Sequence, residues 1–98
     1  MEEITKTTQI QAVIKIYNIK YDGWWYYDVR AEKEVELGTG RKVKIIINAS
    51  VADKYLVEPK ITSDIRDPEK ALFKDEYEDY KKEAEKFLQE LKEILQVQ

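Results

Sequence analysis

The chain of 98 residues contains no cysteine and no histidine. Without cysteine there are no disulfides, no thiolate chemistry and no cysteine-ligated metal site. Without histidine the chain lacks the usual general base and the commonest neutral metal ligand. These absences predict a protein that is not an enzyme and that holds no metal and no cofactor. Asp53, Glu58 and Lys60 mimic the residue order of a metal-dependent nuclease, but their spacing is short and such triples arise readily in a chain that is 38% charged.

The chain also lacks long apolar runs, since its longest aliphatic run is residues 45–47, far short of a bilayer span. It starts with Met1, Glu2 and Glu3, which are acidic or neutral where a signal peptide is basic and then apolar. We therefore expect a cytoplasmic protein with no membrane partner. The length predicts a single domain over residues 1–98. Abundant Lys, Glu, Ile and Tyr with few Asn resembles the composition of thermophile proteins.

The formal net charge of −3 is unevenly distributed along the chain. Residues 67–98 carry ten acidic and six basic side chains, whereas residues 1–66 carry ten acidic and eleven basic ones. The acidity therefore belongs to the C-terminal third. The overall charge says little about what the first two thirds could bind.

The first two thirds of the chain, residues 1–66, alternate apolar and polar residues as strands do. The first strand places Ile10, Ala12, Ile14 and Ile16 on one face. Asp22 and Gly23 then form a hairpin signal, because both tolerate the positive φ of a tight turn. Further segments with strand character or turn residues follow: strands at 24–30, 34–37 and 41–48, a turn at 38–40, a short helical turn at 50–56, and an edge strand or connector at 57–65 that contains Pro59.

Residues 67–96 predict one long amphipathic helix. Asp67 is suited to the N-cap, and Pro68 is suited to the first helical position. Glu69 places an acidic side chain in the first turn. The apolar residues repeat with alternating spacings of four and three, which is a heptad seam. That seam either packs on the sheet or overhangs it and pairs with a second chain as a homodimer. Its members are Phe73, Tyr77, Tyr80, Ala84, Phe87, Leu91 and Ile94.

The run "YDGWWYYDVR" places five aromatic residues within seven positions. Strand alternation puts Trp25, Tyr27 and Val29 in the core and Trp24 and Tyr26 on the solvent face. If the strands are neighbours in a meander, that solvent face combines aromatic rings with cations and has few acids, chiefly Asp28. Other members of this predicted face are Lys15, Tyr17, Tyr21, Arg30, Lys42, Lys44 and Asn48.

Rings interleaved with cations on an open sheet are what a single-stranded nucleic-acid platform needs, because unstacked bases lie on the rings and cations contact phosphates. The sequence thus predicts a non-catalytic binder of single-stranded DNA or RNA. Three other uses of the same residues stay open: a second small core beneath the helix, a protein-interaction module, or an inhibitor, for example a viral one, with an aromatic hot spot. The predicted base-stacking residues are Tyr17, Tyr21, Trp24 and Tyr26, and the predicted phosphate contacts are Lys15, Arg30, Arg41, Lys42 and Lys44.

The stretch "IQAVIKIYNIKYDGWWYYDV", followed by "RKVKIIINASVAD", resembles the C-terminal single-stranded-DNA-binding domain of the large subunit of replication protein A. The resemblance covers about residues 10–55. It implies an oligonucleotide-binding (OB) fold, a barrel of five strands with a face that binds single strands. The cysteines of that family's zinc ribbon are missing here.

The order of strands followed by a helix also resembles the Whirly and positive-cofactor class of single-strand binders. The residues concerned are "YDGWWYYDVR" followed by "GTGRKVKI", although Asp22 stands where that class has a cation. This second resemblance implies a four-stranded antiparallel sheet and a helix that dimerises. The expected fold is therefore α+β, either an antiparallel meander or an incomplete OB-like barrel of 4–5 strands, followed by one long C-terminal helix.

Overall fold

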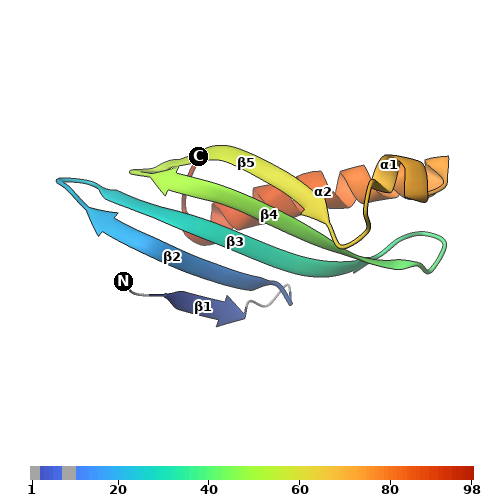
Figure 1. Ribbon diagram of the computed structural model, residues 1–98, viewed down its shortest axis with the longest axis horizontal. Coiled ribbons are helices and arrows are strands. Elements are labelled where there is room, and N and C mark those ends of the chain that lie inside the picture. The colour runs from blue at the N-terminus through green and yellow to red at the C-terminus, as the bar shows by residue number, and fades with distance from the viewer. Residues whose placement is uncertain (1–2, 8–10) are drawn as a thin grey trace.

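The alternating segments of the first two thirds of the chain form a single antiparallel sheet in the computed structural model, which describes residues 3–7 and 11–98. Strand order in the sheet follows chain order, so the sheet is a meander with β1 and β5 at opposite edges (Figure 1). Of the two expected architectures, the open meander followed by a C-terminal helix is therefore the one observed. Its elements are β1 (Ile4–Thr7), β2 (Val13–Tyr21), β3 (Trp25–Glu36), β4 (Lys42–Ala52), β5 (Tyr55–Ser63), α1 (Pro68–Ala71) and α2 (Lys74–Leu95).

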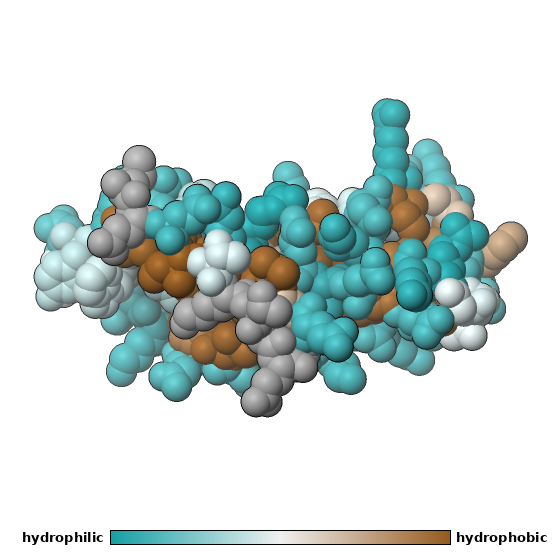
Figure 2. All heavy atoms as spheres, turned by 90° about the horizontal axis from the view of Figure 1, so that it is seen from below, coloured by the Kyte–Doolittle hydropathy of each residue, from teal (hydrophilic) through white to brown (hydrophobic). Residues whose placement is uncertain are grey.

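The core lies between α2 and one face of the sheet. Ile14, Val29 and Ile45 project from three neighbouring strands and are fully buried. Phe87 and Leu91 meet them from α2 and are equally buried. A helix with one apolar stripe is stabilised by covering an apolar sheet face in this way. Apolar side chains accordingly gather along the middle of the view in Figure 2, with polar side chains over most of its outline.

The heptad seam predicted for a partner helix is largely used inside the chain. Tyr80, Ala84, Phe87 and Leu91 are all buried against the sheet. Phe73, at the start of the seam, is 73% exposed. Of the two interpretations of the seam, packing on the chain's own sheet is the one observed, and these four residues are not free to form a dimer interface.

The prediction of one unbroken helix over residues 67–96 was wrong at its beginning. Leu72 and Phe73 have extended backbone conformations, so α1 and α2 are separate helices. Leu72 is buried in the core while Phe73 points away from it. Asp67 does precede α1, but its φ is 53° and its side chain makes no capping hydrogen bond.

Glu76, in the first turn of α2, fastens the helix to the β3–β4 loop. Its Oε2 accepts hydrogen bonds from the Thr39 hydroxyl at 2.6 Å and from Arg41 Nε at 3.1 Å. Its Oε1 accepts one from the Phe73 backbone N–H at 3.2 Å. The bond from Thr39 is the chief reason why the pKa of Glu76 lies below its usual value. A buried carboxylate is tolerated here because every partner favours its charged form.

Two β-bulges change the alternation of side chains along the strands. In β2 an extra residue lies between Tyr17 and Lys20, where Asn18 has a φ of 54°. In β5 the extra residue lies between Val57 and Lys60, where Glu58 has a φ of 49°. Each bulge reverses the face to which the following residues point, because the side-chain period of a strand is two.

The helical turn predicted at residues 50–56 was wrong. β4 continues to Ala52, the chain reverses at Asp53 and Lys54, and β5 starts at Tyr55. Asp53 takes a φ of 58°, a conformation that Asp adopts more readily than most residues. A tight hairpin thus replaces the expected helix and adds Tyr55 to the sheet.

Candidate functional site

The sheet face that α2 leaves uncovered is the candidate site, and we call it the open face. The register of the strands arranges its side chains in three rows near the β2–β3 turn. The row nearest the turn contains Lys20, Tyr26, Ala52 and Tyr55; the middle row contains Tyr17, Asp28, Ser50 and Val57; the third contains Lys15, Arg30, Asn48 and Lys60.

Three tyrosines occupy the first two rows. Tyr26 is 40% exposed and Tyr55 is 57% exposed, while Tyr17 is half-buried beside Asp28. A pocket of about 370 Å³ lies on this part of the open face and is lined by Tyr17, Tyr26 and Val57 together with polar residues. Flat rings with polar neighbours could stack on planar groups and hydrogen-bond their edges.

The third row carries three cations, which we call the cation row: Lys15, Arg30 and Lys60. It crosses the sheet from β2 to β5, a span of about 14 Å at about 4.8 Å per strand. Lys15 pairs with Glu3 at 3.2 Å and Arg30 with Glu32 at 3.0 Å. Such exposed pairs contribute only about 0–1 kcal/mol, so either cation can exchange its partner for another anion at little cost.

Asp28 places one negative charge in the middle row. Its carboxylate accepts hydrogen bonds from Asn18 Nδ2 at 2.9 Å and from the Ser50 hydroxyl at 2.7 Å. These bonds, that from Asn18 first, lower the pKa of Asp28, so the group is ionised at neutral pH. Asp28 holds the bulge of β2 in place, because Asn18 is the residue with positive φ there.

Several predicted phosphate contacts lie where other residues offset their charge. In register, Lys44 lies opposite Glu34, and Lys42 lies opposite Glu36. Acidic and basic side chains therefore alternate on the open face at the end far from the β2–β3 turn. The expectation that Asp28 would be the chief acid of this face was wrong. Arg41 is not on this face, because its guanidinium binds Glu76 of α2 at 3.1 Å.

The aromatic side chains of the β2–β3 turn do not join the tyrosines of the open face as expected. Because of the bulge at Asn18, Tyr21 lies opposite Trp25, and their ring centroids are 4.9 Å apart. Strand alternation places this pair on the side that α2 covers. Trp24 lies in the turn itself and is 51% exposed.

The prediction that Trp25 belongs to the core was wrong, since it is 56% exposed. The β2–β3 turn extends past the C-terminal end of α2, so the helix does not run along this end of the sheet (Figure 1). Tyr27, two residues along β3, packs against the core as expected. The length of α2 thus decides which aromatic of this face is covered.

Sequence reasoning missed Lys20, Tyr55 and Lys60, all of which lie on the open face. Tyr55 was hidden by the assignment of a helical turn. The available signal for a hairpin turn was Asp53, a residue type that tolerates positive φ, followed by strand-forming residues. Lys60 follows Pro59 and a bulge, and nothing local in the sequence indicates on which face it lies.

The nuclease-like triple has no support as a metal site. In residues 3–7 and 11–98, no group of three or more His, Cys, Asp or Glu side chains could hold a metal ion. Asp53 lies in the β4–β5 turn and Glu58 in the bulge of β5.

Among the described elements, neither helix is long and apolar enough to cross a membrane.

Comparison with known proteins gave no match: no protein-family model, no curated protein and no solved structure corresponds to the chain. The resemblances to replication protein A and to the Whirly class remain predictions. Function must be argued from the open face itself.

Proposed function

We propose that the protein binds single-stranded nucleic acid on the open face. The observation that supports this proposal is the placement of Tyr17, Tyr26 and Tyr55 on one exposed sheet surface beside the cation row. Bases of a single strand stack on exposed rings, with about 1–3 kcal/mol per base, while Lys and Arg contact phosphates. Asn48 and Ser50 lie among these residues and can hydrogen-bond base edges.

Duplex is a poorer fit for such a surface. Its bases are already stacked on one another, so the rings of Tyr26 and Tyr55 would gain nothing from it. A single strand presents both faces of its bases and a flexible backbone. We therefore expect clear preference for single strands over duplex of the same length.

Fluorescence anisotropy with a dye-labelled oligo-dT strand tests the stacking role. Tyr26→Ala and Tyr55→Ala should each weaken binding by about 1–3 kcal/mol, since each removes one stacking ring. Tyr21→Ala is the matched control, because it removes an exposed tyrosine from the other side of the sheet. Absence of binding at low salt, or an equal loss in Tyr21→Ala, would contradict the proposal.

Salt dependence tests the role of the cation row. Each phosphate contact to a single strand contributes roughly −0.7 to the slope of log K against log salt concentration. Lys60→Gln should therefore make the slope shallower by about 0.7. Lys86→Gln, a neutralisation of an exposed lysine on α2, should leave the slope unchanged. Equal effects of the two variants would count against phosphate contacts at the cation row.

A protein-interaction module is the second candidate, and the exposed Tyr21, Trp24 and Trp25 favour it. Trp and Tyr are enriched at interface hot spots. These three lie at the β2–β3 turn, away from the cation row, so a protein bound there would show little salt dependence. Loss of partner binding in Trp24→Ala with unchanged oligonucleotide binding would assign the turn to this second role.

A further inference from the structure

The outer edge of β5 carries unpaired backbone groups. The Asp64 N–H points inward to the Lys44 carbonyl, at 3.4 Å. Because these groups alternate along an antiparallel strand, the N–H and C=O of Ile61 and Ser63 point outward. Elsewhere on the same edge, the Leu56 N–H already donates to the Gln98 carbonyl at 2.9 Å. Gln98 therefore occupies one end of this edge, and the other end is open.

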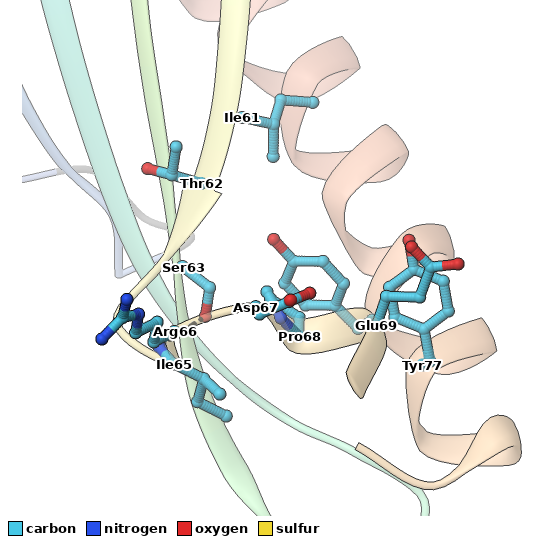
Figure 3. Close-up of a pocket in the computed structure, with 10 residues that line it drawn as sticks. Ile61, Thr62, Ser63, Ile65, Arg66, Asp67, Pro68, Glu69 and Tyr77 are labelled. Atoms are coloured by element: carbon cyan, nitrogen blue, oxygen red, sulfur yellow. Dashed lines mark hydrogen bonds between the residues drawn. The ribbon is translucent and has the colours of Figure 1, made fainter. Parts of the chain in front are cut away.

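A hollow lies beside the core along this edge. Ile61, Tyr80 and Ala84 border a gap of about 270 Å³ between β5 and α2. A second gap of about 420 Å³ shares Ile61 and Tyr80 and is also lined by Tyr77. Figure 3 shows Ile61 on β5 and Tyr77 on α2 around this second gap. An additional strand beside β5 would place apolar side chains over these residues.

We infer that the occupant of this edge is β5 of a second copy of the chain, paired antiparallel about a two-fold axis at Ile61. Ile61 of each copy would exchange both backbone hydrogen bonds with Ile61 of the other. Ser63 N–H of each copy would donate to the Pro59 carbonyl of the other. Pro59 has no N–H, which commonly blunts edge strands, but this register asks only for its carbonyl.

The charges beside the gap favour a second copy over an unrelated peptide. Lys81 and Glu85 border the same gap as Ile61. A two-fold axis at Ile61 makes the two α2 helices antiparallel, so that Lys81 of each copy lies opposite Glu85 of the other. The surface is thus complementary to itself, as an isologous interface requires. This dimer is formed by the edge of β5 and not by pairing of the two helices along the heptad seam, although Tyr77, Tyr80 and Ala84 of the seam border the gap. It does not depend on the proposed function.

Analytical ultracentrifugation from micromolar to millimolar concentration tests the inference. The wild-type chain should show a reversible monomer–dimer equilibrium. Lys81→Glu and Glu85→Lys should each weaken the dimer by about tenfold, because each turns two exposed attractions into repulsions. The double variant Lys81→Glu/Glu85→Lys should restore wild-type affinity. Lys86→Glu, the same charge change on the opposite flank of α2, should have no effect.

Hydrogen exchange locates the interface. The Ile61 and Ser63 amides should exchange about tenfold more slowly in the dimer than in the monomer. The Leu56 amide, already bonded to Gln98, should change little. A monomer at all concentrations overturns the inference and leaves the edge to a peptide from another protein. A dimer that ignores Lys81→Glu and leaves Ile61 unprotected also overturns it, because such a dimer uses another surface.

Discussion

Glu76 is the residue whose ionisation matters most to the junction between sheet and helix. It is almost inaccessible and accepts hydrogen bonds from Thr39, Arg41 and Phe73. These partners favour the carboxylate over the neutral acid and so depress its pKa. A depressed folded-state pKa makes the free energy of unfolding depend on pH in a defined direction.

The stabilisation from Glu76 should be complete above its unfolded-state pKa, near 4.5, and should disappear as the pH falls through the lower folded-state value. Glu76→Gln should therefore lower the melting temperature at neutral pH, and the difference from wild type should shrink as the pH falls below 4.5. Thermal unfolding followed by circular dichroism across this range measures it. Glu78→Gln, at an exposed position, is the control. A difference that is constant with pH would show that Glu76 contributes only through its shape.

At the scale of elements, α2 owes its position to the apolar residues of its heptad pattern. The only two phenylalanines of the chain belong to that pattern, and they differ completely in environment. Phe87 is fully buried between helix and sheet, while Phe73 lies at the break before α2 and is exposed.

Phe87→Ala should destabilise the protein by about 3–5 kcal/mol, because it removes a buried ring and leaves a cavity. Phe73→Ala should change stability by no more than about 0.5 kcal/mol. Urea denaturation of both variants measures the difference. A large loss of stability in Phe73→Ala would mean that the Phe73 ring packs against another molecule, because it is exposed in the single chain.

Periodicity in the sequence was sufficient to predict much of this architecture. Alternation correctly assigned Lys15, Tyr17 and Tyr26 to one face, and the spacing of apolar residues identified α2. Both patterns arise because a regular strand or helix packs one face against another regular element. The prediction of strands before a helix, and hence of the α+β class, needed nothing more.

The errors occurred where the backbone is irregular or where an element ends. The bulge at Asn18 reversed the face of Tyr21, and a positive φ at Asn18 is not encoded by any periodic pattern. Trp25 has the alternation of a core residue but is exposed beside the β2–β3 turn, and its exposure depends on tertiary structure alone. Arg41 was recognisable as a cation, but its partner Glu76 is 35 residues away in the sequence.

At the scale of the whole molecule, charge is distributed between two sides. The open face carries the cation row, whereas residues 67–98 carry ten acidic against six basic side chains. The described part of the molecule is elongated, with extents of 47 × 23 × 21 Å, and α2 lies behind the sheet in Figure 1. A nucleic acid would thus meet favourable charge on one side only.

Photo-crosslinking to an oligonucleotide containing 4-thiothymidine tests this polarity. Crosslinked peptides, identified by mass spectrometry, should come from residues 15–30 and 48–60, which contain the open-face tyrosines. Peptides from α2 should be unmodified, because its acidic side chains repel phosphates. Crosslinks concentrated on α2 would show that the strand binds a different side of the molecule.

The hydrogen bonds of Gln98 also affect where a purification tag can be attached. Its N–H donates to the Lys54 carbonyl and its own carbonyl accepts from Leu56, so Gln98 lies against β5 in parallel orientation. Residues joined after Gln98, whether an affinity tag or a fusion partner, would start beside the outer edge of β5. A purification tag that follows Gln98 would cover this edge and weaken the dimer inferred above.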